Sequence, residues 1–189
     1  IDTPCYLALD GDQLVRDDLA RFCRAFDSLW DRMTGDVQHD LTRHWQRCAA
    51  LLRDGYPVAV VLSSRSPRYA CAVGSTFVVM QMPAMRLLAD ETLTFILAHE
   101  LGHVIRHVRS EQTPDTRAEE RAADTWGVRW LGQSSVFAAA DDVQVHREEM
   151  ERVLADCRGY PYPEQAMGAL WLVDPYTSPS RRFSGARNV

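Results

Sequence analysis

The sequence predicts an α+β protein, in which a small twisted sheet lies beside one long helix and further helices surround both. Three observations support this fold class. Apolar residues recur at helical spacing over residues 12–33 and again over 37–52. Apolar runs rich in β-branched residues, at 58–62 and 69–80, are typical of strands. Helical patterns then return at about residue 90 and continue to about 156.

The two N-terminal helices each have one apolar face. In the first helix this face consists of Val15, Leu19, Phe22, Phe26, Leu29 and Met33. In the second helix it consists of Val37, Leu41, Trp45, Cys48 and Leu52. Gly55 and Pro57 then end the second helix. We interpret both faces as parts of a protein core. Residues 1–56 are predicted as a helical N-terminal segment of a single domain that spans residues 1–189.

The strands and the later helices follow from local signals. Gly74 and Ser75 lie in the middle of the 69–80 run and predict a tight turn or a bulge there. Asp90 and Glu91 begin a long helix that continues to about Val108, because acidic residues are favoured at the positive N-terminal end of a helix. Further helices are predicted over residues 116–131, 139–156 and 164–173, and an irregular tail over 174–189.

Composition excludes several classes of protein. The chain has 189 residues, 46% of them hydrophobic and 25% charged, which is ordinary for a globular domain. Its net charge of −5 argues against a broad nucleic-acid surface, which needs a basic face. No apolar run reaches the roughly 18 residues that predict a transmembrane helix. The five cysteines are odd in number and include no CxxC pair, so neither a disulfide framework nor a cysteine zinc site is predicted.

The strongest chemical signal is the sequence His99-Glu100-Leu101-Gly102-His103. Positions four apart lie on one face of a helix, so both imidazoles can point at one metal ion and Glu100 can reach a water beside it. The alternative is a pair of surface histidines on an amphipathic helix. The apolar stretch 93–98 directly before the motif favours a site that is buried or lines a cleft, and buried histidines need partners.

The next predicted helix offers a third metal ligand. Glu120 and Asp124 are one helical turn apart, so one carboxylate can bind the ion while the other accepts the N–H of a ligating imidazole. Glu119 is interpreted as an ordinary solvated acid, and the same interpretation is the alternative for Glu120. His107, one turn beyond His103, is interpreted as helix surface rather than as a spare ligand.

HExxH followed by ExxxD on the next helix resembles the gluzincin pattern, and more closely the HtpX-like and Oma-like zinc peptidases, relatives of the CaaX prenyl protease. The resemblance covers roughly residues 58–187. Its landmarks are the strand and hairpin at 69–79, the active-site helix at 99–107, the ligand helix at 120–127, Gly159-Tyr160 and Ser178-Pro179-Ser180. It implies a gluzincin-like fold, with residues 57–189 as the catalytic core.

The resemblance also implies roles for single residues. One Zn2+ per chain would be held by His99, His103 and Glu120, with Glu100 as general base and Asp124 orienting His99. The implied substrate strand is Tyr69, Ala70, Cys71 and Ala72. The chain departs from the family at two places: Tyr69-Ala70-Cys71 replaces Asn-Ala-Phe, and Ser178-Pro179-Ser180 replaces His-Pro-Ser. That Asn helps to hold substrate backbone and that His lies near the oxyanion. Candidate replacements as oxyanion donors are Tyr69, Tyr176, Arg181 and Arg182.

These features predict a zinc-dependent endopeptidase that cleaves extended or unfolded proteins, with a role in protein quality control. The alternative is a latent or weakly active zinc-binding module that binds peptides or regulates a partner, because the predicted ligands and base survive while two substrate-handling groups do not. A third hypothesis is a different HExxH branch, the peptidases that cleave phage or stress repressors. The chain opens with Ile1, so we expect that an upstream piece was removed. The compartment stays open, with the bacterial periplasm or envelope as a guess.

Overall fold

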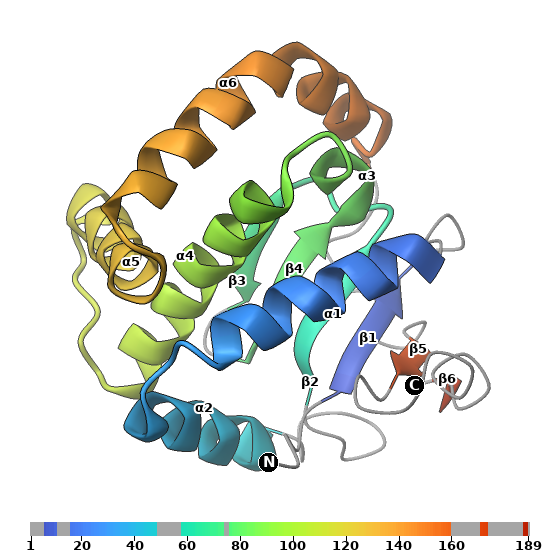
Figure 1. Ribbon diagram of the computed structural model, residues 1–189. Coiled ribbons are helices and arrows are strands. Elements are labelled where there is room, and N and C mark those ends of the chain that lie inside the picture. Colours follow the sequence, from blue (N-terminus) through green and yellow to red (C-terminus); the bar gives the residue numbers. More distant parts are fainter. Residues whose placement is uncertain are drawn as a thin grey trace.

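The computed structural model describes residues 6–10, 16–48, 58–73, 76–159, 171–173 and 187–188. Within these ranges the fold is α+β, as predicted, with six helices and one mixed sheet. Figure 1 shows α4 between strands β3 and β4 on one side and α5 and α6 on the other, with α1 crossing in front of the sheet. The candidate metal-binding motif therefore lies on the most central helix.

The strands of the sheet are β1 (Tyr6–Asp10), β2 (Val58–Ser63), β3 (Ala70–Val73), β4 (Phe77–Gln81), β5 (Trp171–Val173) and β6 (Arg187–Asn188). Their order in space is β3-β4-β2-β1-β5-β6. Strands β1, β2 and β4 run parallel, whereas β3 pairs antiparallel with β4, opposing Cys71 to Val79 and Ala72 to Val78. Strand β3 is thus an edge of the sheet, with one side left for other contacts.

The sequence predicted β2, β3 and β4 but missed the other strands. Strand β1 lies in the segment expected to be helical, and it pairs with β2 and β5. The helix predicted over 164–173 is wrong at 171–173, which form β5, and its remainder lies outside the described residues. The tail expected to be irregular contributes β6 at 187–188. All three segments are very short, so periodicity cannot distinguish them. Strand β1 in addition pairs with strands that are remote in the chain.

The helices are α1 (Arg16–Trp30), α2 (Gly35–Cys48), α3 (Met82–Met85), α4 (Asp90–Val108), α5 (Thr116–Leu131) and α6 (Gln133–Asp156). The predicted bounds of α4 and α5 are confirmed. The helix expected from about residue 139 begins at Gln133 instead, and α3 was missed because it has only four residues. Residues 12–15 of the first predicted helix, 49–52 of the second, and the turn at Gly74 and Ser75 lie outside the described ranges.

The described residues of the apolar faces predicted for the first two helices are buried in the core, except Cys48, which is half-buried. Phe22, Leu41 and Trp45, for example, are each 0% exposed. They share one cluster with β2, β4 and the inner residues of α4. Burial of each such side chain contributes about 1.5–3 kcal/mol. The core therefore fixes α4 against the sheet, which places the HExxH motif beside β3.

The connection from α4 to α5 is tightly specified. Helix α4 ends with the N–H of Ser110 bonded to the carbonyl of His107 and the N–H of Glu111 bonded to that of Arg106. This is a Schellman cap, and Ser110 occupies its left-handed position with φ 57°. Asp115 then caps α5, because its carboxylate accepts the N–H groups of Arg117 and Ala118. The short loop between the two caps sets how α5 lies on α4.

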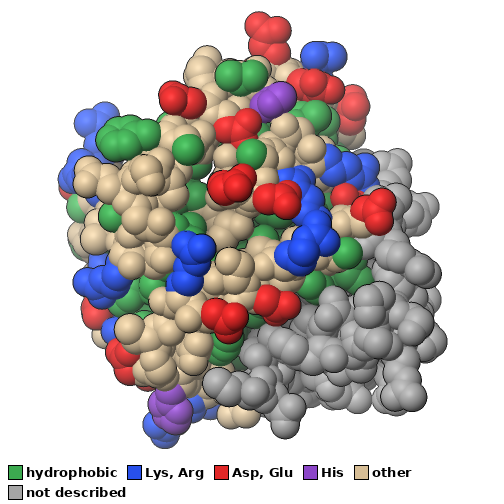
Figure 2. All heavy atoms as spheres, viewed as in Figure 1, with side chains coloured by type: hydrophobic (Ala, Val, Ile, Leu, Met, Phe, Trp, Pro, Cys, Tyr) green, Lys and Arg blue, Asp and Glu red, His purple; other side chains and the backbone are tan. Residues whose placement is uncertain are grey.

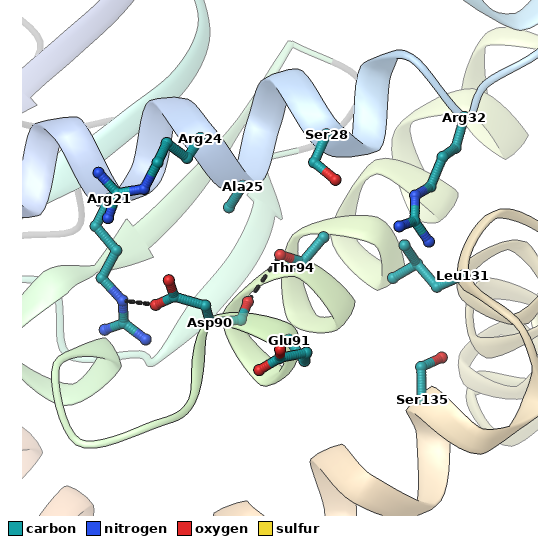
Figure 3. A pocket seen from close by; sticks show the side chains of 10 residues that line it. All are labelled: Arg21, Arg24, Ala25, Ser28, Arg32, Asp90, Glu91, Thr94, Leu131 and Ser135. Carbon is teal, nitrogen blue, oxygen red and sulfur yellow. Dashed lines mark hydrogen bonds and ion pairs between the residues drawn. The ribbon is translucent and has the colours of Figure 1, made fainter.

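A hollow of about 360 Å³ lies where α1 crosses the start of α4, and Arg21 forms one of its walls (Figure 3). The Arg21 guanidinium pairs with Asp90 and donates to the carbonyl oxygens of Met85, at 2.7 Å, and Leu88. The side chain is 16% exposed, so these bonds form at the edge of the core. Arg21 therefore connects α1 to the turn that precedes α4, the helix with the HExxH motif.

We expect Arg21→Met to lower the free energy of unfolding by about 2–3 kcal/mol, because two carbonyl groups lose their charged donor. Arg24→Met is the matched control. Arg24 lines the same hollow and is exposed, and no ion pair or hydrogen bond within the described part of the chain involves its guanidinium. Its substitution should change stability by no more than about 0.5 kcal/mol. Urea unfolding of both variants checks this, and equal losses would contradict the role given to Arg21.

Figure 2 shows the side chains on one face of the molecule. Basic and acidic side chains are interspersed over the described part of this face, and they do not gather into one basic area there. None of the described helices combines the length and the apolar composition that crossing a bilayer requires.

Candidate metal centre

Three donor groups converge between α4 and α5. His99 and His103 lie one turn apart on α4, with their Nε2 atoms 3.2 Å from each other. Glu120, on α5, places its carboxylate oxygens 3.3 Å from Nε2 of His99 and 3.7 Å from Nε2 of His103. Among the described residues these are the one group of three or more His, Cys, Asp or Glu side chains with donor atoms close enough to share an ion, all within 4.8 Å.

The spacing of these atoms fits a small divalent ion. Two ligand atoms at about 2.0–2.1 Å from a tetrahedral zinc lie roughly 3.3 Å from each other. The two Nε2 atoms, 3.2 Å apart, are close to this value, and the two Glu120 oxygens lie 3.3 Å from His99 and 3.7 Å from His103, respectively. With one donor atom from each residue, all three atoms lie within 4.8 Å of one another. Two imidazoles and one carboxylate are also a donor set that leaves one position open, as catalytic zinc sites do. The residues present therefore fit zinc and other metals with the same ligand preferences.

The histidine rings present the right nitrogen atoms. Nδ1 of His99 lies 2.8 Å from the Asp124 carboxylate, which is the contact that the family resemblance implies. With its proton on Nδ1, His99 offers Nε2 as a lone-pair donor. Burial, and secondly the neighbouring His99, lowers the pKa of His103 below its usual value. His103 is therefore neutral at neutral pH, which is the form that binds a metal.

Glu100 lies beside the donor cluster on the inner side of α4. Its side chain is buried, with the residue 9% exposed, and its carboxylate accepts the backbone N–H of Ala72 on β3. Burial raises the pKa of the Glu100 carboxyl to about 7, and the nearby His99 opposes this rise. A carboxyl group that changes its protonation state near neutral pH can both accept and release a proton under working conditions.

A polar groove of about 430 Å³ runs between the metal donors and the edge of the sheet. Its walls are β3 with Arg68, two residues before the strand, the ligand face of α4, the start of α5 and the loop that joins these helices. The residues that line it are Arg68, Ala70, Cys71, Ala72, His99, Glu100, His103, Gln112, Glu119 and Glu120. The groove thus brings the predicted ligands, base and substrate strand together.

One residue of the predicted substrate strand is not brought to this groove, and three predicted oxyanion donors lie outside the described residues. Tyr69 is absent from its lining and packs against the core instead. Burial raises the pKa of Tyr69, and Glu151 of α6 adds to the rise, so the hydroxyl lies on the α6 side of β3. Tyr176, Arg181 and Arg182 lie outside the described residues, as do Tyr160 and residues 178–180. Arg68 and Gln112 line the groove without having been singled out, because no motif marks them.

The sequence predicted Glu119 to be an ordinary solvated acid, and this prediction is wrong. Its side chain is 14% exposed, whereas that of Glu120 is 55% exposed. Arg106 donates to both Glu119 oxygens at 3.0 Å, and the N–H of Thr113 adds a third bond at 3.0 Å. Arg106 is the main cause that lowers the pKa of Glu119 to about 2. Glu119 is therefore a fixed, charged group, and its carboxylate lies 3.7 Å from Nδ1 of His103.

The chain was compared with models of protein families, with curated proteins and with solved structures, and none of them matched. The resemblance to the HtpX-like and Oma-like peptidases therefore depends on the motif residues of this chain alone.

Proposed function

We propose that this protein is a zinc-dependent endopeptidase with a gluzincin-like site. The observation that carries the proposal is the convergence of His99, His103 and Glu120 beside buried Glu100 in a groove bordered by a sheet edge. Each part has a use in peptide hydrolysis. The donor cluster can hold a metal, Glu100 can move protons, and the edge strand can hold an extended chain.

The metal would be held by His99, His103 and Glu120, and when bound it would polarise a substrate carbonyl and make a nearby water more acidic. Glu100 would take a proton from the attacking water on its carboxylate and pass this proton to the nitrogen of the leaving amine. Two features support this role. The carboxylate is held in place by the Ala72 N–H, and its raised pKa suits both steps. Such proton transfer contributes typically 10²–10⁴-fold to a rate.

The substrate would lie extended along β3. Since β3 pairs with β4 on one side, and Tyr69 accepts the N–H of Gln81 on that same side, alternation turns the backbone groups of Ala70 and Ala72 toward the groove. The Ala72 N–H donates to Glu100, so the groups offered to a substrate are the Ala70 N–H and the carbonyl oxygens of Ala70 and Ala72. An extended peptide can add to such an edge through main-chain hydrogen bonds. Recognition of this kind depends little on side chains, so we propose unfolded or extended protein segments as the substrate class.

The test is hydrolysis of casein by zinc-loaded protein. Glu100→Gln is expected to lower the rate at least 10²-fold while it retains one zinc per chain, because the ligands are unchanged. The matched control is Glu148→Gln, which removes an exposed acid from α6, far along the chain from the site. The control should cleave casein at the wild-type rate.

Two other results would count against the proposal. If Glu100→Gln cleaves casein as fast as wild type, the proton-transfer role is wrong. If neither protein cleaves while both retain one zinc, the latent peptide-binding module becomes the better hypothesis, and binding of unfolded casein to both proteins would then support it.

A further inference from the structure

Each histidine of the candidate metal centre has an acidic side chain on the Nδ1 side of its ring. For His99 it is Asp124, at 2.8 Å. For His103 it is Glu119, whose Oε1 lies 3.7 Å from Nδ1. The motif pattern points to Asp124 but assigns nothing to Glu119. We propose that Glu119 is a positioning residue, which holds the His103 ring so that Nε2 faces the metal, and this inference rests on the proposed metal centre.

Glu119 is itself held rigidly. Its two oxygens accept three hydrogen bonds of 3.0 Å, two from the guanidinium of Arg106 and one from the backbone N–H of Thr113. Arg106 is also fixed, because it is 13% exposed and donates to the backbone oxygen of Glu111. Paired, charge-assisted bonds of this kind restrict both orientation and distance. A group that positions another must first be immobile, and Glu119 meets this condition.

The network connects both helices that carry metal donors. Arg106 follows His103 by three residues, so both side chains lie on one face of α4. Glu119 directly precedes Glu120 on α5, and the two adjacent carboxylates lie at different nitrogen atoms of His103, Glu119 beside Nδ1 and Glu120 beside Nε2. The ion pair between Arg106 and Glu119 therefore sets the rotation of α5 relative to α4. Through that rotation it also sets where the Glu120 carboxylate meets the histidines.

The chemistry of the ring requires a partner at this position. Nε2 of His103 faces Nε2 of His99 and the carboxylate of Glu120, so the ring proton belongs on Nδ1. The distance of 3.7 Å from Nδ1 to Glu119 exceeds that of a direct hydrogen bond. A ring shift of under about 1 Å would form one. A carboxylate beside a ligating imidazole fixes its tautomer and makes it a stronger ligand.

The experiment follows the imidazole signals of zinc-loaded protein labelled with 15N at histidine. In wild type, His103 should carry its proton on Nδ1. Glu119→Gln keeps the size of the side chain but removes its charge, so the His103 Nδ1 proton should shift upfield while the His99 signal stays. Asp124→Asn should do the reverse. Competition with a chelator should show zinc affinity about 10–100-fold weaker in Glu119→Gln. A merely structural role would move the signals of both rings together.

Other outcomes would overturn the inference. An unchanged His103 signal in Glu119→Gln, or zinc affinity within twofold of wild type, would overturn it while leaving the proposed peptidase intact. A wild-type His103 ring protonated on Nε2 would also overturn it, and this measurement needs no variant to fold. Absence of zinc binding at these histidines in wild type would overturn the proposed function together with this inference.

Discussion

Zinc is expected to raise the melting temperature of the wild-type protein by roughly 10 °C, and His99→Ala is expected to abolish this increase. A ligand that binds only the folded state, at about a thousandfold excess over its dissociation constant, adds about 4 kcal/mol of stability. For a domain of this size, each kcal/mol raises the melting temperature by roughly 2–4 °C. His99 supplies one of the three metal-donor atoms, and its Nδ1 forms a hydrogen bond with the Asp124 carboxylate. Its loss therefore removes a ligand and leaves Asp124 without the ring that it orients.

The matched control for this experiment is His107→Ala. His107 lies on the same helix, two turns beyond His99, and its side chain is exposed. It belongs to no group of donors that could share an ion within the described ranges. Scanning calorimetry with and without zinc should therefore show the full increase in His107→Ala. An increase of wild-type size in His99→Ala would show that zinc binds elsewhere, and the proposed metal centre would then be wrong.

Helices α4 and α5 could be predicted from the sequence because their signals are local. Acidic residues begin α4, apolar residues recur along it, and Asp115 caps α5. Strand β1 could not be predicted in the same way. It has five residues, and it is a strand because β2 and β5 lie on either side of it. Such pairing joins residues more than 50 positions apart in the chain. The periodicity of a short segment contains no information about these partners.

The candidate site shows the same division. The four-residue spacing of His99 and His103 already places both rings on one face of a helix. The same four-residue spacing between Glu120 and Asp124 indicated Glu120 as a ligand. The role of Glu119 could not be predicted, because the spacing relates Glu120 to Asp124 alone and left Glu119 as a solvated acid beside Glu120. The structure distinguishes them through Arg106, which binds Glu119 from the neighbouring helix. The residue that separates the roles of Glu119 and Glu120 is thus Arg106, which does not belong to the HExxH motif.

Gly102→Ala is expected to weaken zinc binding at least 10-fold and to lower the free energy of unfolding by about 1–2 kcal/mol. Gly102 lies inside the HExxH motif where α5 crosses α4 most closely. A Cβ atom there would come within 3.0 Å of the Ala123 carbonyl oxygen and of Trp126 Cβ. Neither atom can rotate away, because one is backbone and the other is attached directly to it. The two helices would have to separate.

Separation of the helices would act on the metal centre through Glu120. His99 and His103 stay on α4, whereas Glu120 moves with α5, so a shift of a few tenths of an ångström alters the distances of 3.3 and 3.7 Å between them. Overpacking costs about 1–3 kcal/mol, which exceeds the roughly 1 kcal/mol that alanine gains over glycine inside a helix. A 10-fold loss of affinity corresponds to about 1.4 kcal/mol.

Gly35→Ala is the control for the general effect of replacing a helical glycine. Gly35 begins α2, and a Cβ atom there would meet nothing within 4 Å. Its substitution should leave zinc affinity unchanged and should keep or slightly raise stability. Chelator competition and urea unfolding of both variants measure the two quantities separately. If Gly102→Ala lost stability but bound zinc as wild type does, α5 would not hold the third ligand, because the ligand would have tolerated a displacement of the helix that carries it.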